Sequence, residues 1–263
     1  MRRLGQTFTA LRERGERALV AYLTAGDPDL RASEELVLAA AEAGADVIEL
    51  GVPFSDPVAD GPVIQQACQR ALAAGTTLRG VLRLVEAVRK HSPVPLVLFG
   101  YYNPFYAFGL RALATAAGQA GVDGLLVVDL PPEELAEMKA ESEPAGLDTI
   151  LLVAPTTTPD RLRWIVREAS GFLYLVAVTG VTGARPDLAY AVDERIREIR
   201  RLTALPICVG FGIATAQQAV EAGRMADGVV VGSALVQLVE AHRGAPAPVQ
   251  ALIRDLKGAL SGR

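Results

Sequence analysis

Eight short apolar runs, separated by segments with helical periodicity, constrain the fold of this chain more than any other feature of its sequence. The runs are continuously apolar and do not alternate with polar residues, which is typical of parallel strands that are buried on both faces. Most of the intervening segments have the length and amphipathic pattern of one helix. The expected strands are residues 18–24, 46–50, 95–99, 124–128, 149–153, 171–176, 206–209 and 227–231.

Eight β–α units in 263 residues predict an α/β fold, a (β/α)8 TIM barrel with extra N-terminal and rim helices. The gap between the second and third strands is the longest and is expected to hold two helices. No linker rich in Pro, Gly or Ser divides the chain, so we expect a single domain over 1–263. A doubly wound open sheet is the alternative that the same pattern allows.

Composition narrows the functional classes. The net charge of −4 argues against nucleic acid as the main partner. No apolar run approaches 18 residues, and the N-terminal segment lacks the apolar stretch of a signal peptide, so we expect a cytoplasmic protein without membrane contact. Cys68 and Cys208 lie in helical and strand-like surroundings and are interpreted as buried thiols.

Glu49 is the first candidate for chemistry, because it lies between Ile48 and Leu50 in a strand that should be fully buried. A buried carboxylate is costly unless it is paired or used. In a barrel, the carboxyl ends of the strands carry the active site. Glu49 is therefore expected to be a carboxyl group with a raised pKa that can shuttle a proton. Pairing with an Arg at the rim is the structural alternative.

Asp56 and Asp60 lie on the long segment that follows, which contains too much Pro and Gly to form a helix. Either residue, taken alone, could serve a turn or cap the next helix. The physical properties of the sequence do not choose between these two aspartates.

Small residues follow the last three expected strands and indicate a phosphate site. They form Thr179–Gly183, Gly210–Gly212 and Gly232–Ser233. Backbone N–H groups in such loops can approach an anion closely, and a helix that starts near Ser233 would direct its positive end there. Each glycine alone could also be only a turn.

The sequence lacks the residue patterns of Schiff-base, metal and dinucleotide chemistry, which points to acid–base chemistry without a cofactor. The three lysines and two histidines lie away from the expected strand ends, and no cluster has metal-ligand spacing. No Gly-x-Gly-x-x-Gly run follows the first strand, so dinucleotide binding has no support. We therefore expect no metal and no cofactor in this chain.

An aromatic run follows the third expected strand: residues 101–108 hold five of the 14 aromatic side chains. These side chains could simply cover the barrel rim. The functional interpretation is that some line an aromatic pocket and others face a partner protein.

Several motifs together resemble the tryptophan synthase α-subunit family over essentially the whole chain. They are LTAGDPD, IELGVPFSDPVADGP, YYNPFY, VVDLPPEE, VTGVTGAR and VGFGI. The resemblance implies that Glu49 is the catalytic acid–base and that Asp60, not Asp56, is the second catalytic carboxylate, which accepts a hydrogen bond from the indole N–H.

The resemblance also assigns substrate-binding positions. The indole pocket and its surroundings would be formed by Tyr22, Phe99, Tyr101, Leu126, Asp129, Leu152, Tyr174 and Phe211. The phosphate site would be formed by Thr182, Gly183, Gly212, Gly232 and Ser233.

The implied reaction is retro-aldol cleavage of indole-3-glycerol phosphate to indole and glyceraldehyde 3-phosphate. Indole would pass to a β subunit that carries pyridoxal phosphate (PLP), in an α2β2 complex. Two alternatives stay open: a phosphate-binding barrel isomerase of amino-acid biosynthesis, and a regulatory subunit without turnover of its own.

Overall fold

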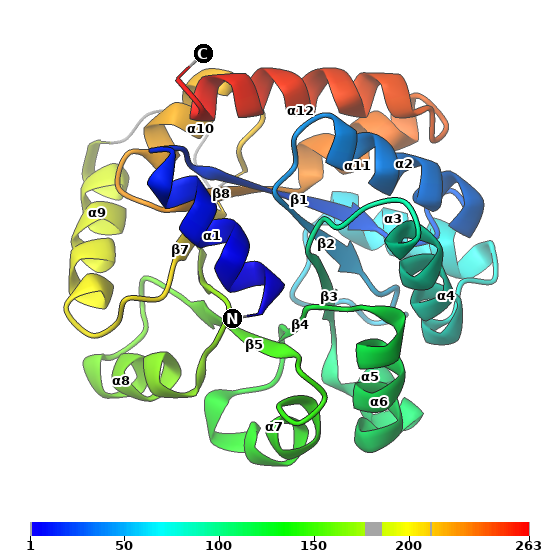
Figure 1. The fold of residues 1–263 in the computed structure, drawn as a ribbon, viewed down its shortest axis with the longest axis horizontal. Coiled ribbons are helices and arrows are strands. Elements are labelled where there is room, and N and C mark those ends of the chain that lie inside the picture. Colours follow the sequence, from blue (N-terminus) through cyan, green and yellow to red (C-terminus); the bar gives the residue numbers. More distant parts are fainter. Residues whose placement is uncertain (1, 177–185, 211, 263) are drawn as a thin grey trace.

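The computed structural model describes residues 2–176, 186–210 and 212–262. Its eight strands are parallel and pair in chain order, and β8 pairs with β1 to close the barrel (Figure 1). This confirms the predicted barrel and excludes the open sheet. The strands are β1 Ala18–Thr24, β2 Val47–Gly51, β3 Leu96–Gly100, β4 Gly124–Val127, β5 Asp148–Val153, β6 Leu173–Val176, β7 Ile207–Gly210 and β8 Gly228–Val231.

Helices surround the barrel, and the expected pair lies between β2 and β3 (Figure 1). Asp29 and Thr77 set the starts of α2 and α4, because their side chains accept backbone N–H groups of the first turn. The helices are α1 Arg3–Glu13, α2 Leu30–Glu42, α3 Pro62–Ala73, α4 Leu78–Arg89, α5 Tyr102–Phe108, α6 Leu110–Ala120, the 3-10 turn η1 Pro132–Glu134, α7 Ala136–Ser142, α8 Pro159–Glu168, α9 Pro186–Arg200, α10 Ala216–Gly223, α11 Ser233–Ala241 and α12 Pro246–Leu260.

Strand alternation separates an inner from an outer hydrophobic core. In β2, Ile48 and Leu50 belong to the large cluster formed with the surrounding helices. Val47 belongs to the inner cluster, together with Val20 and Val97 of the neighbouring strands. Because successive side chains of a strand point to opposite faces, Glu49 shares the inner face with Val47.

Helix α1 closes the amino-terminal end of the barrel. Its buried residues Leu4, Phe8 and Leu11 belong to the inner cluster, and the Phe8 and Phe172 rings lie 5.7 Å apart. In Figure 1 this helix lies across the near end of the strands. A functional site on the barrel axis must therefore open at the opposite end, where the strands have their carboxyl termini.

A repeated hydrogen-bond pair holds the strands together at this closed end. A polar residue shortly before each even-numbered strand accepts, at 2.8 Å, an N–H of the preceding strand and donates its own N–H to the carbonyl of the same residue. The four pairs are Asp46 with Leu19, Asp123 with Leu96, Ser170 with Thr149, and Asp227 with Ile207.

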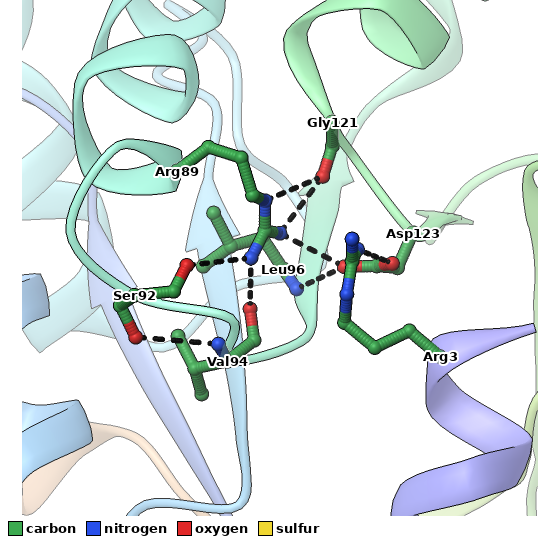
Figure 2. A network of polar contacts seen from close by, with 7 residues as sticks. All are labelled: Arg3, Arg89, Ser92, Val94, Leu96, Gly121 and Asp123. Atoms are coloured by element: carbon green, nitrogen blue, oxygen red, sulfur yellow. Dashed lines mark hydrogen bonds and ion pairs between the residues drawn. The ribbon is translucent and has the colours of Figure 1, made fainter.

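Asp123 also receives two guanidinium groups (Figure 2). Arg3 of α1 and Arg89 of α4 both form ion pairs with its carboxylate, which is 7% exposed. Arg89 further donates to the carbonyl oxygens of Gly121 and Val94. One buried carboxylate therefore fixes α1, α4 and the β3–β4 edge together.

We predict that Asp123→Ala destabilises the fold by about 2–4 kcal/mol, because it leaves two partly buried guanidinium groups and the Leu96 N–H without their acceptor. Urea unfolding at neutral pH measures the effect. Glu35→Ala is the control, since Glu35 belongs to an exposed ion pair with Arg31, which should contribute less than about 1 kcal/mol. Equal effects of the two substitutions would contradict the prediction.

Candidate active site

Glu49 is the middle residue of β2 and lies on the inner face of the barrel, in register with Tyr22 of β1 and Val97 of β3. The residue is 1% exposed, and within the described residues neither carboxylate oxygen has a hydrogen-bond partner. The rim Arg that the structural alternative requires is therefore not found in the part of the chain that the structure describes. Burial raises the pKa of Glu49 from 4.5 to about 8, so the group is mainly a neutral acid at pH 7.

Aromatic and aliphatic side chains surround this end of the barrel interior. The rings of Tyr22 and Phe99 meet edge to face, with centroids 5.1 Å apart. Phe99, Leu126, Leu152 and Tyr174 all pack on the inner cluster. The structure thus brings together these five predicted pocket residues, from five different strands, on the inner face that carries Glu49.

Two glycines make room for the tyrosines: Gly51, which the sequence did not single out, and Gly210, which was expected only as part of a phosphate loop. A Cβ on Gly51 would lie 2.1 Å from the Tyr22 hydroxyl oxygen, and a Cβ on Gly210 would lie 2.2 Å from that of Tyr174. Each glycine is the last residue of its strand. That shared position was the only sign of their role in the sequence.

Asp60 lies on the segment between β2 and α3 and is held by Tyr101. The Tyr101 hydroxyl donates to Asp60 Oδ2 at 2.9 Å and accepts the Ala59 N–H at 3.0 Å. The Phe54 ring packs 5.3 Å from the Tyr101 ring. Burial raises the pKa of Asp60, and the hydrogen bond from Tyr101 partly opposes this shift.

The geometry distinguishes the two aspartates that the sequence left equivalent. Asp56 is exposed and accepts a hydrogen bond from its neighbour Ser55. Asp60 is half-buried, and Gln65 of α3 donates to its backbone carbonyl at 2.9 Å. Gln65 is a second residue that the sequence did not single out. It fixes the backbone from which the Asp60 side chain projects.

Asp129 lies on the same rim but is exposed. Its carboxylate accepts the Tyr102 N–H at 2.7 Å, at the start of α5. In this structure it therefore caps a helix near the pocket. The predicted site residues Thr182, Gly183 and Phe211 lie outside the described residues.

Helix α11 presents the N-terminus that best fits an anion. Gly232 is its N-cap, no side chain among the described residues caps this end, and the first turn holds no acidic residue. The neighbouring α10 differs, because Thr215 and Gln218 form a complete capping box there. The free N–H groups of the α11 first turn can therefore bind phosphate oxygens. Ser233 is exposed beside them.

Gly212 follows β7 on the same side of the barrel and has a φ of +60°. This left-handed conformation favours glycine, which lets a backbone approach a ligand closely. Fold and site together define the class: a (β/α)8-barrel enzyme with a buried, protonatable carboxyl group beneath an aromatic pocket and a helix N-terminus that no described side chain caps.

The sequence model of the tryptophan synthase alpha chain family matches residues 8–258. The chain belongs to this family. Membership confirms the resemblance that the motifs carried. It also favours the lyase over the isomerase and over a subunit without turnover.

Individual relatives extend over nearly the full length. The tryptophan synthase alpha chain of Citrifermentans bemidjiense is 55% identical over 261 residues, which cover 99% of this chain and 96% of the relative. That of Nitrosococcus oceani is 48% identical, with 99% and 98% covered.

Solved structures agree with the sequence relatives. The tryptophan synthase subunit alpha of Legionella pneumophila superposes with a TM-score of 0.91 at 36% identity, with all of both chains covered. A chain of Mycobacterium tuberculosis tryptophan synthase superposes with a TM-score of 0.91 at 38% identity, over 99% of this chain and 98% of that one.

The described residues show neither a membrane-spanning helix nor a cluster of metal ligands. They contain no helix long and apolar enough to cross a membrane. No group of three or more His, Cys, Asp or Glu side chains in the same part of the chain could hold a metal ion.

The raised pKa of Glu49 predicts a pH-dependent stability. The folded protein keeps a proton that the unfolded chain releases near pH 4.5. This contribution to stability is therefore complete below pH 4.5, decreases as pH rises, and is lost above about pH 8. Glu49→Gln cannot titrate, so its stability relative to the wild type should increase by roughly 3–5 kcal/mol across this window. Urea unfolding of both proteins at several pH values measures the difference; a constant difference would show that Glu49 has an ordinary pKa.

Proposed function

We propose that Glu49 and Asp60 carry out the reaction of the family in this chain. The chain is a lyase of tryptophan biosynthesis that cleaves indole-3-glycerol phosphate to indole and glyceraldehyde 3-phosphate. The observation that carries the assignment is the Glu49 carboxyl group, fully buried, without a partner among the described residues, and with a pKa near 8. Such a group can give up and take back a proton near neutral pH.

Glu49 serves both proton transfers of the cleavage. As the neutral acid it protonates the indole ring carbon that bears the glycerol chain. As the resulting carboxylate it takes the proton of the adjacent glycerol hydroxyl, and the carbon–carbon bond breaks as the aldehyde forms. The carboxyl group ends in its starting state, so the proton count balances.

Asp60 stabilises the positive charge that protonation places on the indole ring. Its carboxylate accepts the indole N–H, and a charge-assisted hydrogen bond is strongest where water is excluded. Tyr22, Phe99, Leu126, Leu152 and Tyr174 supply the apolar walls that hold the ring. Tyr101 orients Asp60 through its hydroxyl group.

The phosphate binds at the N-terminus of α11. Gly232, Ser233 and Gly212 offer backbone N–H groups and, at Ser233, a hydroxyl group. Thr182 and Gly183 complete this site by their match to the family motif, and Phe211 and Asp129 complete the surroundings of the indole pocket. The whole chain 1–263 forms one domain, works in the cytoplasm, and needs no cofactor of its own.

The partner is a tryptophan synthase β subunit that carries PLP, in an α2β2 complex. The surface that supports this proposal combines α5 with the segment before α3. Tyr106 is 57% exposed and Val58 is 84% exposed. The Tyr102 and Tyr106 rings on α5 lie 5.6 Å apart and are tilted by 32° relative to each other. Exposed aromatic and apolar side chains are common anchors of protein interfaces.

Substitution of the carboxyl groups tests the catalytic assignment. Glu49→Gln should keep the fold and lower kcat at least ~10²-fold, because an amide cannot transfer the proton. Asp60→Asn should be severely impaired, while Asp56→Asn, an exposed and matched control, should be much milder. Steady-state release of glyceraldehyde 3-phosphate measures all three. Near-normal cleavage by Glu49→Gln, or a reversed order of the two aspartates, would contradict the assignment.

Activation by the partner tests the proposed interface. Asn103 is an exposed residue of α5. Asn103→Ala and Val58→Ser should require more β subunit for half-maximal stimulation of cleavage, since each shortens an exposed side chain of the proposed surface. Val220→Ser, which changes an exposed apolar residue on α10, is the control and should behave like the wild type. Titration of each variant with β subunit gives the half-maximal concentration. Unchanged titrations in both interface variants would place the docking surface elsewhere.

A further inference from the structure

Arg70, in the last turn of α3, joins two carboxylates from distant parts of the chain. Its Nε and Nη2 atoms donate to the two oxygens of Asp27, each at 2.8 Å. Its Nη1 atom donates to Glu240 Oε1 at 2.9 Å. The Asp27 side chain is 3% exposed, whereas that of Glu240 is 48% exposed. The ion pair with Asp27, called here the Asp27 arm, is therefore buried. The ion pair with Glu240, the Glu240 arm, is open to solvent.

The three residues belong to elements that reach three parts of the rim. Asp27 lies in the loop after β1. Arg70 belongs to α3, which begins at Pro62, directly after Asp60 and Gly61. Glu240 belongs to α11, whose first turn contains the proposed phosphate site. A single planar guanidinium group thus connects the helix that follows Asp60 with the helix that follows Gly232.

A small apolar cluster packs the same elements together. It consists of Tyr22 from β1, Ile64, Ala67 and Cys68 from α3, and Val236 from α11. These contacts lie along the helices, while the ion pairs hold their carboxyl-terminal halves. The two helices and β1 therefore form one packed unit, and Arg70 fixes α11 relative to α3 within it.

We propose that Arg70 is a positioning residue that sets the separation between the phosphate turn at Gly232–Ser233 and the segment that bears Asp60. The printed hydrogen bonds of its guanidinium group go to Asp27 and Glu240, which are not among the proposed substrate-binding residues. A substrate bound at both ends requires a defined separation, because the second end gains its high effective concentration only if both subsites fit at once. A ligand that occupies only one of the two subsites does not depend on their separation. The inference rests on the proposed function, since it takes Asp60 and the α11 turn as the two ends of the site.

Two different substitutions remove the Glu240 arm and keep the buried arm. In Arg70→Lys the ammonium group has no planar fork, so it pairs with the buried Asp27 and releases Glu240. Glu240→Gln removes the same ion pair from the other side, at a half-exposed residue whose replacement leaves the core intact. Glu35→Gln is the matched control, because it removes a carboxylate from an exposed ion pair on α2.

Binding of a linked ligand and of its two fragments tests the proposal without turnover. The linked ligand is indole-3-propanol phosphate, which has no hydroxyl group to be cleaved. The fragments are indole and glycerol 3-phosphate. Isothermal calorimetry should show that Arg70→Lys and Glu240→Gln bind the linked ligand about three- to fivefold more weakly, the range of a partly exposed ion pair, while each fragment stays within about twofold. The control should match the wild type for all three ligands.

Equal weakening of the fragments and the linked ligand would overturn the proposal, because it would show a general loss of structure. Unchanged binding of the linked ligand in Glu240→Gln would overturn it as well. Failure of the proposed function looks different: the wild type would bind these ligands and leave indole-3-glycerol phosphate intact. In that case the comparison between linked ligand and fragments still decides whether Arg70 sets the separation.

Discussion

The burial of an unpaired carboxyl group on the inner face of a closed barrel is the constraint on which this structure depends. Glu49 is 1% exposed and has no hydrogen-bond partner among the described residues, so its neutral form is strongly favoured. An ion at this position would have to be desolvated without compensation. The barrel tolerates the group because both neighbouring strands hold β2 in register and because the acid can remain protonated. The same environment that is unfavourable for a charged side chain suits the group to the proton transfer proposed for it.

Stability and chemistry are placed at opposite ends of the strands. At the amino-terminal end, the paired hydrogen bonds repeat at every second strand; they are formed by Asp46, Asp123, Ser170 and Asp227. The three aspartates among them also form ion pairs with Lys or Arg side chains. At the carboxyl end, the part of the chain that is described supplies neither a hydrogen-bond partner for Glu49 nor a side-chain cap for α11. The fully bonded end can hold the strands in place while the other end keeps groups free for a ligand.

Local pattern was sufficient to predict the strands and the burial of Glu49, and it was not sufficient for the contacts that cross the rim. Continuous apolar runs placed the strands to within two residues, because buried parallel strands have few other compositions. Asp60 could not be separated from Asp56 by the same means, since its distinguishing contact comes from Tyr101, 41 residues away. Gly51 and Arg70 were missed for the same reason: the ring over Gly51 and the carboxylates around Arg70 belong to other elements. The choice of Asp60 came from the family resemblance, and the structure supplies a physical reason that supports it.

Tyr101 gives the rim a route by which a bound partner could affect the chemistry. It directly follows β3, its hydroxyl group holds Asp60 and the Ala59 N–H, and the next residue begins α5. Asp129 fixes that next residue by accepting the Tyr102 N–H. A protein that contacts α5 and the exposed Val58 would therefore contact the two segments that carry Tyr101 and Asp60, and so affect the hydrogen bond between them. Such a partner can raise the rate by favouring one position of Asp60, which shifts a population and adds no catalytic group. Because binding free energies are reciprocal, a ligand that fixes Asp60 in the same position must then strengthen the contact with the partner.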